Sequence, residues 1–237
     1  MSAGAAVAWP AEWLAGAAPL ATTVWRGVEA QHIVATLSLV DTLAEQSLLE
    51  QLLETSKPPL PAGSAGLHYL LNTPFRYRSP YASRFRRAAA PGVWYGAETL
   101  RAAATEVAYW RWRFVTASVG LRAETVYTQH SFFTANVQGL AIDLSTPPWS
   151  KQRELWTHDS DYTQPQALAD AARAAGLAWL RYESVREAAA HNAAVFKPSA
   201  LSVDLPVAPQ TWHCKASASN VTLQRDSERY AWSFQNT

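Results

Sequence analysis

Beyond residue 90 the chain alternates short strand-like segments with two helix patterns whose ends are well marked. One helix is expected to begin near Thr99, a good N-cap residue, and to run to about residue 117. A second is expected over residues 165–176, because Pro165 near its start and Gly176 at its end are typical of a helix. The strand-like segments are 93–96, 124–134, 140–144, 179–185, 193–196, 211–217, 221–224 and 230–234. This order predicts an α+β fold with a substantial β-sheet.

The N-terminal third is expected to contain one further helix, over residues 34–53, because its apolar residues recur at helical spacing. That helix must end before Pro58 and Pro59, since proline cannot continue a helix. No internal repeat or low-complexity linker divides the 237 residues, a length that suits one large domain. We therefore expect a single domain over residues 1–237.

Composition excludes several classes of protein. Twenty Lys and Arg residues balance nineteen Asp and Glu residues, so a net charge of +1 gives no general case for nucleic-acid binding or for an anionic membrane surface. The single cysteine, Cys214, excludes an internal disulfide framework and a multi-cysteine zinc site. The six histidines lack the short paired spacing of a metal site, so no metal is expected. The N-terminus lacks the early basic residues of a signal peptide, and the uncharged stretch 13–25 is shorter than the ~20 residues of a membrane span. We expect a soluble, cytoplasmic protein.

A basic segment over residues 73–87 is the first candidate for ligand binding. Aromatic residues separate its five arginines, which are Arg76, Arg78, Arg84, Arg86 and Arg87. A guanidinium presents a planar pair of donors that suits phosphate oxygens. The alternative is a solvated basic loop, or arginines that pair with surface carboxylates.

Two further polar residues are candidates for a ligand site. Glu106 lies in the helix expected after Thr99, where a carboxylate facing a cleft would stabilise a cation. Local sequence alone favours an exposed glutamate paired with Arg101 or Arg113. Ser184 follows a strand-like segment and could donate a hydrogen bond to a ligand, although a structural role is the common one at such a position. It lacks the G-x-S-x-G surroundings of a hydrolase nucleophile.

Five short motifs, taken together and in this order, resemble the RES-domain family, the toxins of bacterial toxin–antitoxin pairs that are named for Arg, Glu and Ser residues. They are S-R-F at 83–85, W-Y-G-A-E at 94–98, E-V-A-Y-W-R at 106–111, Y-E-S-V-R at 182–186 and N-x-x-V-F at 192–196. The resemblance covers about residues 22–200 and leaves an N-terminal extension, 1–21, and C-terminal strands, 201–237, without an assigned role. One departure is Ala82, because the family usually has glycine before the Ser-Arg pair.

The resemblance implies an ADP-ribosyltransferase-like fold, with a split β-sheet core and flanking helices around an NAD cleft. It implies that NAD+ is the substrate rather than a cofactor, and that the nicotinamide–ribose bond is cut. Three acceptors of ADP-ribose remain open: phosphate (an NAD+ phosphorylase), water (a glycohydrolase) or a protein (an ADP-ribosyltransferase). A non-enzymatic interaction module is a further alternative. The implied partner is an antitoxin with a helix-turn-helix DNA-binding region.

Carried over position by position, the resemblance implies a pocket built from Arg26, Arg84, Tyr95, Glu106, Ser184 and Asn192. Glu106 would stabilise the oxocarbenium-like ribose. The two arginines would clamp the pyrophosphate, and Tyr95 would stack on a ring. Glu106, Arg84 and Tyr95 are thus the predicted catalytic residues. Ser184 and Asn192 are predicted to bind NAD+ together with Arg26, Arg84 and Tyr95. All of this requires that side chains far apart in the sequence meet in one cavity.

Overall fold

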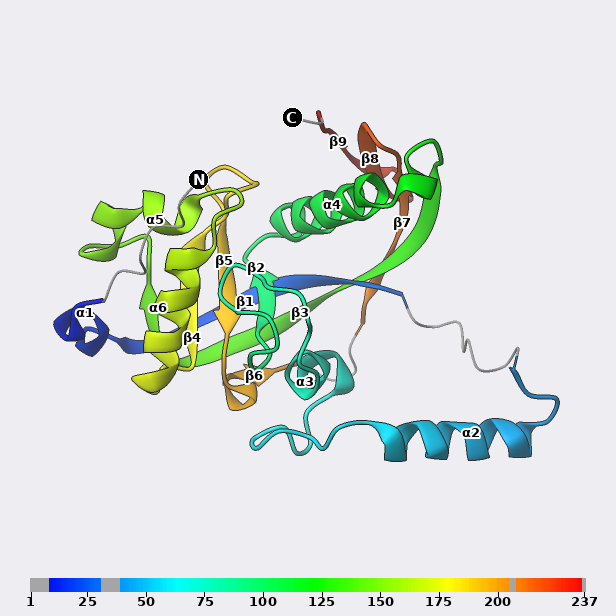
Figure 1. Ribbon diagram of the computed structural model, residues 1–237, viewed down its shortest axis with the longest axis horizontal. Helices are drawn as coiled ribbons and strands as arrows, with labels where there is room; N and C mark the ends of the chain where they lie inside the picture. Colours follow the sequence, from blue (N-terminus) through cyan, green and yellow to red (C-terminus); the bar gives the residue numbers. More distant parts are fainter. Residues whose placement is uncertain (1–8, 31–38, 205–207, 236–237) are drawn as a thin grey trace.

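A nine-stranded sheet organises the computed structural model, which describes residues 9–30, 39–204 and 208–235 (Figure 1). The strands are β1 (Ala18–Glu29), β2 (Trp94–Ala97), β3 (Val126–Asp143), β4 (Trp179–Glu183), β5 (His191–Val195), β6 (Leu201–Ser202), β7 (Gln210–Ala216), β8 (Asn220–Arg225) and β9 (Glu228–Ser233). The α-helices are α1 (Ala11–Ala15), α2 (Leu43–Ser56), α3 (Tyr69–Arg76), α4 (Leu100–Ala117), α5 (Glu154–Thr157) and α6 (Thr163–Ala174). The predicted α+β class, with helices flanking a sheet, is confirmed.

The long strand β3 divides the sheet into two branches. Along one edge β3 pairs antiparallel with the whole of β1, from Ala18 opposite Ala141 to Glu29 opposite His130. Its other edge is shared by β7, β6 and β4 in succession. One branch runs through β4, β5 and β2 back to β1, and the other continues through β7 to β8 and β9. The sheet is therefore split along β3, as expected for this fold.

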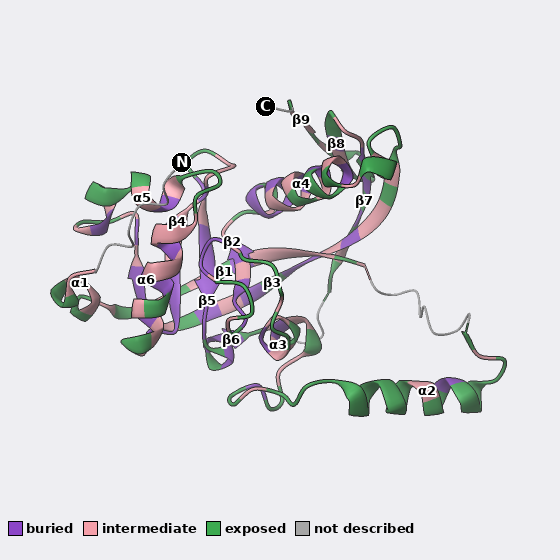
Figure 2. Cartoon of the chain, in the orientation of Figure 1, coloured by how far each residue is buried: buried purple, intermediate pink, exposed green. Residues whose placement is uncertain are grey.

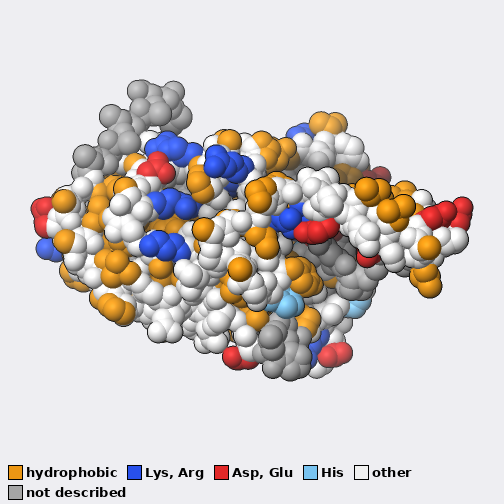
Figure 3. Space-filling model, turned by 90° about the horizontal axis from the view of Figure 1, so that it is seen from below, with side chains coloured by type: hydrophobic (Ala, Val, Ile, Leu, Met, Phe, Trp, Pro, Cys, Tyr) orange, Lys and Arg blue, Asp and Glu red, His pale blue; other side chains and the backbone are white. Residues whose placement is uncertain are grey.

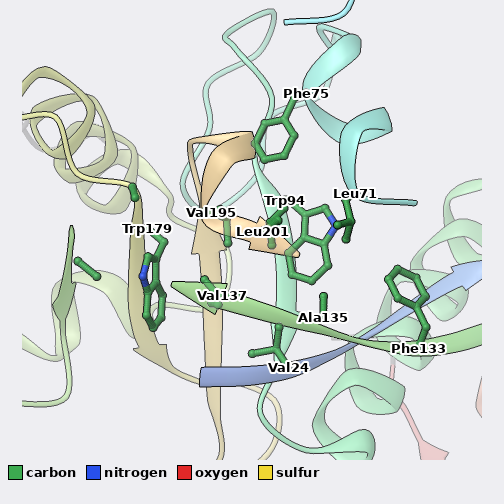
Figure 4. Packing of buried hydrophobic residues seen from close by; sticks show 14 residues of the cluster. Val24, Leu71, Phe75, Trp94, Phe133, Ala135, Val137, Trp179, Val195 and Leu201 are labelled. Carbon is green, nitrogen blue, oxygen red and sulfur yellow. The ribbon is translucent and has the colours of Figure 1, made fainter. Parts of the chain in front are cut away.

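Apolar side chains fill the space enclosed by the first branch. Trp94, Trp179, Val24, Val137 and Val195 are all buried and belong to one cluster (Figure 4). A second buried cluster lies under α6, and a third lies between α4 and the branch formed by β7, β8 and β9. Buried residues accordingly concentrate in the central strands and on the inner faces of α4 and α6 (Figure 2).

Helix α4 begins as the sequence predicts, because the side chain of Thr99 accepts a hydrogen bond from the amide of Ala102. Its buried face packs against the C-terminal branch, where the rings of Trp112 and Phe234 stack with their centroids 4.8 Å apart. Its other face looks toward β1. The same helix thus joins the C-terminal strands to the part of the sheet where the predicted site residues lie.

Several segments differ from expectation at their boundaries. The segments 124–134 and 140–144 are parts of one strand, β3. The twelve-residue strand β1 was not predicted at all. Helix α3 was not predicted, and the basic segment 73–87 begins inside this helix, which continues to Arg76. The C-terminal strands and the helix over 165–176 were predicted with small shifts of their ends.

Helix α2 stands apart from the sheet as an arm (Figure 1). It begins at Leu43 rather than at residue 34, because Thr42 and Glu45 form a capping box there. Residues 34–38 of the predicted helix lie outside the described residues. Four of the leucines whose spacing predicted this helix, at positions 43, 48, 52 and 53, are exposed on the arm. Figure 3 shows apolar and acidic side chains side by side on this arm.

Candidate active site

A cavity of about 650 Å³ lies between α4 and the neighbouring strands. It is lined by Trp25, Arg26, Gly27, Glu29, Ser83, Arg84, Tyr95, Gly96, Ala97, Ala103, Glu106, Val107, Trp110, Arg111, Phe114, His130, Tyr162, Tyr182, Arg186 and Asn192. Five of the six predicted site residues are among them, and Ser184 is not. The expectation that distant side chains meet in one cavity is therefore met by all of these residues except Ser184.

The floor of the cavity is a row of residues that runs across four strands. Trp25 of β1 is opposite Ala97 of β2, which is opposite Asn192 of β5, which in turn is opposite Tyr182 of β4. Residues opposite one another in antiparallel strands point to the same face of the sheet. The register of the sheet therefore places Asn192 in the same row as Trp25, with Ala97 between them, and both residues line the cavity.

One wall of the cavity is α4, which lies close against β1. A Cβ atom at Gly27 would come within 2.5 Å of the Phe132 ring and 2.7 Å of the Val107 side chain, so only glycine allows this approach. Further along, Arg111 of α4 forms an ion pair with Glu29 of β1, with an N–O distance of 2.5 Å. The helix and the strand thus run side by side in the same direction and bound a cleft between them.

Arg84 is buried and held in place by backbone carbonyls. Its Nη1 donates hydrogen bonds to the carbonyls of Trp156 and His158 over 2.6 and 2.7 Å, and its guanidinium lies 4.9 Å from the centre of the Tyr162 ring. Its Nη2 is buried and has no hydrogen-bond partner among the described residues. A fixed guanidinium that keeps one nitrogen unpaired is suited to receive an anionic oxygen.

Tyr95 holds the loop that carries Arg84. Its hydroxyl lies 2.9 Å from Ser83 Oγ and accepts a hydrogen bond from the amide of Phe85 over 3.1 Å. Burial raises the pKa of this phenol, so the hydroxyl stays protonated at neutral pH. The structure thus gives Tyr95 a positioning contact that the predicted stacking role did not include. Ala82, beside this loop, is not among the described residues with positive φ, so its backbone needs no glycine.

Arg26 and Asn192 each bring an unpaired polar atom to the cavity. Arg26 Nη1 donates to the carbonyl of Tyr95 over 2.7 Å, while its Nε is buried and unpaired within the described chain. Burial lowers the pKa of Arg26 to about 10, which leaves it charged at pH 7. Asn192 is 3% exposed, and its side-chain oxygen also has no partner among the described residues. Buried polar groups without partners are uncommon, and these two atoms lie on residues that line the cavity, where a ligand with complementary atoms would satisfy them.

Glu106 lies in the cavity wall and pairs with Arg186. The Arg186 Nη1 donates to both carboxylate oxygens, over 2.8 and 3.2 Å. The pairing with Arg101 or Arg113 that local sequence favours is wrong, because Arg101 binds Glu187 instead. Burial lowers the pKa of Arg186, but the Glu106 charge and hydrogen bonds to tyrosines outweigh it, so the pKa is raised overall. Glu106 is consequently held as an oriented carboxylate on the cavity side of α4.

Ser184 lies behind the cavity wall. It is 5% exposed, and its Oγ accepts a hydrogen bond from the amide of Glu187 over 3.1 Å. That contact fixes the turn from which Arg186 reaches Glu106. The structure therefore places Ser184 where it shapes the site, and not where it would touch a ligand in the cavity.

The basic segment contributes a single arginine to the cavity. Arg76 pairs with Glu54, Arg87 pairs with Asp170, and Arg86 donates to backbone carbonyls of its own loop. The alternative of surface pairing thus holds for part of the segment, and Arg84 alone carries the phosphate-binding hypothesis into the cavity.

Sequence reasoning missed four cavity residues that have distinct chemistry: Trp110, Phe114, His130 and Arg186. A signal existed for two of them, because Glu106, Trp110 and Phe114 recur every four residues and must share one face of α4. Burial, followed by the charge of Arg111, lowers the pKa of His130 to about 4, so its ring is neutral at pH 7. Its Nδ1 is buried without a partner in the described chain.

No group of three or more His, Cys, Asp or Glu side chains lies close enough to hold a metal ion within the described ranges. No described helix is both long and apolar enough to cross a membrane.

Comparison with known proteins identifies a family and shows distant similarity to solved structures. The family model described as "RES domain" matches residues 60–217, so it begins later than the resemblance seen in the sequence and extends to the end of β7. No curated protein matched the chain. Among solved structures, the MbcT–MbcA toxin–antitoxin complex of M. tuberculosis is similar at 13% identity over 87% of this chain and 91% of that chain, with a TM-score of 0.48. That similarity is too distant to carry an argument about function.

Proposed function

The chain belongs to the RES-domain family, and from the cavity we propose that it is an NAD+-consuming enzyme that cuts the nicotinamide–ribose bond and acts as the toxin of a toxin–antitoxin pair. One observation carries the proposal. Arg26, Arg84 and Asn192 each present a buried polar atom without a partner in the described chain, in the cavity that also contains Glu106. Leaving such atoms unpaired costs free energy, which a bound ligand would recover if its phosphate oxygens accept from the two arginines and one of its hydroxyl groups donates to Asn192.

The charges around Glu106 suit a pyrophosphate. The guanidiniums of Arg26, Arg84 and Arg186 line the cavity together with the single carboxylate of Glu106, so these four side chains give an excess of two positive charges. Arg84 is fixed by two carbonyls and Arg26 by one, so neither has to be ordered when the substrate binds. Such preorganisation lowers the entropy cost of binding and holds the substrate in register.

Glu106 supplies the charge that the reaction requires. As the bond from ribose C1 to nicotinamide nitrogen breaks, its electron pair passes to the pyridinium ring, which leaves as neutral nicotinamide, and positive charge develops on the ribose. A fixed carboxylate close to that ribose stabilises the transition state more than the ground state. The acceptor then bonds to C1: water gives ADP-ribose and a proton, whereas phosphate gives a phosphorylated ADP-ribose.

Arg186 orients Glu106 for this task. A single nitrogen of Arg186 donates to both carboxylate oxygens, so each oxygen keeps lone pairs for a ribose hydroxyl. The Arg186 guanidinium lies 3.8 Å from the centre of the Tyr109 ring, and that contact fixes the arginine in turn.

The test is release of nicotinamide. Purified protein is incubated with NAD+ with and without inorganic phosphate, and nicotinamide and the ADP-ribose product are separated and identified. We expect nicotinamide release by the wild type and a loss of at least a hundred-fold in kcat for Glu106→Gln, with KM changed little. No release under any condition from folded protein would refute the enzymatic proposal. Labelled NAD+ added to lysate identifies a protein acceptor.

The antitoxin partner is part of the same proposal. If the chain is a toxin, its expression should stop growth, and co-expression of the neighbouring reading frame should restore it. Growth arrest that persists in Glu106→Gln would favour a non-enzymatic mode of action by contact with a partner.

A further inference from the structure

The cavity extends past Glu106 to a second end with different chemistry. This end is formed by Trp110, Phe114 and Arg111 of α4, Glu29 of β1 and His130 of β3. Trp110 and Phe114 are 49% and 51% exposed, although both belong to a helix whose other face is buried. Large aromatic side chains that are left open beside a charged cavity have a high propensity to contact a ligand.

The length of the cleft can be worked out from both of its walls. On α4, Phe114 lies eight residues beyond Glu106, which is about 12 Å along the helix axis, with Trp110 halfway between them. On β1, Glu29 lies four residues beyond Trp25, which is about 13 Å along the strand. The lengths along the two walls are similar. They measure the same cleft because α4 and β1 run in the same direction, as the contacts at Gly27 and Arg111 require. A cleft of this length has room for both halves of a dinucleotide.

The charge differs between the two ends. Around Glu106 the guanidiniums exceed the carboxylates, whereas at the second end Arg111 and Glu29 neutralise one another in an ion pair. His130 adds no charge at pH 7, because its pKa lies near 4. The second end is therefore neutral and aromatic, which disfavours a phosphate and favours an uncharged planar heterocycle.

His130 provides a polar contact for the edge of such a ring. The side chain is 4% exposed, and its Nε2 lies 3.1 Å from Thr128 Oγ1, while Nδ1 is unpaired among the described residues. A neutral imidazole presents either one N–H or one lone pair at that nitrogen. Adenine has both donors and acceptors on its edge and a face that stacks on aromatic rings.

We propose that this second end is a stacking subsite for the adenine base of the substrate, with Trp110 and Phe114 as the platform and His130 as the polar contact. This inference rests on the proposed function, because it assumes a dinucleotide whose other half lies at Glu106. It goes beyond that function in assigning the specificity for the nucleobase to α4 residues that follow Glu106 at intervals of four.

The kinetic test compares NAD+ with nicotinamide mononucleotide, which has the same scissile bond and no adenine. The measured quantity is the ratio of kcat/KM for the two substrates in the wild type, Trp110→Ala, Phe114→Ala and Tyr127→Ala. Tyr127 is a matched control, since it is 70% exposed and does not line the cavity. We expect the ratio to fall about ten-fold in each of the first two variants, as for loss of one base–aromatic stack, and to stay unchanged in Tyr127→Ala.

Phe114→Ala is the more discriminating variant. The guanidinium of Arg186 lies 5.7 Å from the centre of the Trp110 ring, so a change at Trp110 can also disturb the partner of Glu106. A ratio unchanged in Phe114→Ala, with a wild type that cleaves both substrates, would overturn the inference and leave the proposed function standing.

A binding measurement separates failure of the subsite from failure of the proposed function. Calorimetry with AMP and with ribose 5-phosphate requires no turnover. The inference predicts that Phe114→Ala weakens AMP binding about ten-fold while ribose 5-phosphate binds as to the wild type. Equal AMP binding by wild type and variant, or no AMP binding by the wild type, would overturn it even if the chain proves to have no activity on NAD+.

Discussion

Replacing Arg186 with methionine tests whether the site is built around the pair that it forms with Glu106. The two side chains are largely buried, with 13% and 27% of their surfaces exposed, and their closest N–O distance is 2.8 Å. Methionine keeps much of the apolar bulk of arginine against Tyr109 but removes the charge and the donors. The carboxylate of Glu106 is then left in the cavity wall without its partner.

The size of the effect follows from the burial of the pair. Exposed ion pairs contribute up to about 1 kcal/mol to the free energy of unfolding, whereas breaking a fully buried pair lowers it by about 3–5 kcal/mol. Because this pair lies between those limits, we expect Arg186→Met to lower the free energy of unfolding by about 2 kcal/mol. For a chain of this length that is a fall in Tm of about 4–8 °C. Part of this decrease in the free energy of unfolding should disappear when Glu106 is also neutralised.

A double-mutant cycle measures this coupling. Unfolding in denaturant is followed for the wild type, Arg186→Met, Glu106→Gln and the double variant, and we expect a coupling free energy of about 1–2 kcal/mol. Single-turnover cleavage of NAD+ by Arg186→Met should also be slower, because Glu106 is no longer oriented. Additive effects on stability, with a coupling below about 0.5 kcal/mol, would refute the argument that Arg186 holds Glu106.

Three further changes test the surroundings of the cavity. Gly27→Ala should lower the free energy of unfolding by about 1–3 kcal/mol, because the added Cβ meets the Phe132 ring, and thermal unfolding measures this. Tyr95→Phe should lower the free energy of unfolding by about 1 kcal/mol and should also lower kcat/KM for NAD+, because the loop that carries Arg84 loses two hydrogen bonds to the hydroxyl. Hydrogen bonds from Arg181 lower the pKa of Glu98, so its stabilisation is present above the unfolded pKa of about 4.3 and is lost as the pH falls through the lower folded value. Denaturant unfolding should accordingly show the stability gap between wild type and Glu98→Gln narrowing below about pH 4.

The parts of the fold that were predicted correctly are those whose sequence signals are local. Helix α4 has its capping residue, and strands β4, β5, β7, β8 and β9 were found from short apolar segments bounded by turns, whereas the two-residue strand β6 was not predicted. Strand β1 was missed, although Thr22, Thr23 and Val24 favour a strand, because its identity depends on pairing with β3 more than a hundred residues later. Helix α2 was predicted from leucines at helical spacing, yet no local pattern tells whether another element covers that side of the helix.

The site was predicted from motifs, and its remaining residues depend on spatial relations that no local motif contains. Asn192 reaches the cavity through the pairing of β5 with β2 and β4. Arg186 replaces Arg101 and Arg113 as the partner of Glu106 because a turn eighty residues away, fixed by Ser184, delivers it there. The sequence could have yielded the spacing of Trp110 and Phe114 from Glu106, but not which face of the helix the cavity would occupy.

The C-terminal strands, which had no role in the sequence reasoning, bear on Glu106 through α4. Strands β8 and β9 lie beyond the residues that the family model matches. They cover the back of the helix, where Phe234 stacks on Trp112 and the indole of Trp232 donates to the hydroxyl of Thr105 over 3.2 Å. Thr105 also donates to Glu187, which follows Arg186 directly. One chain of contacts therefore connects the last strand, which lies beyond the residues that the family model matches, to Thr105 and Glu187, the sequence neighbours of Glu106 and Arg186.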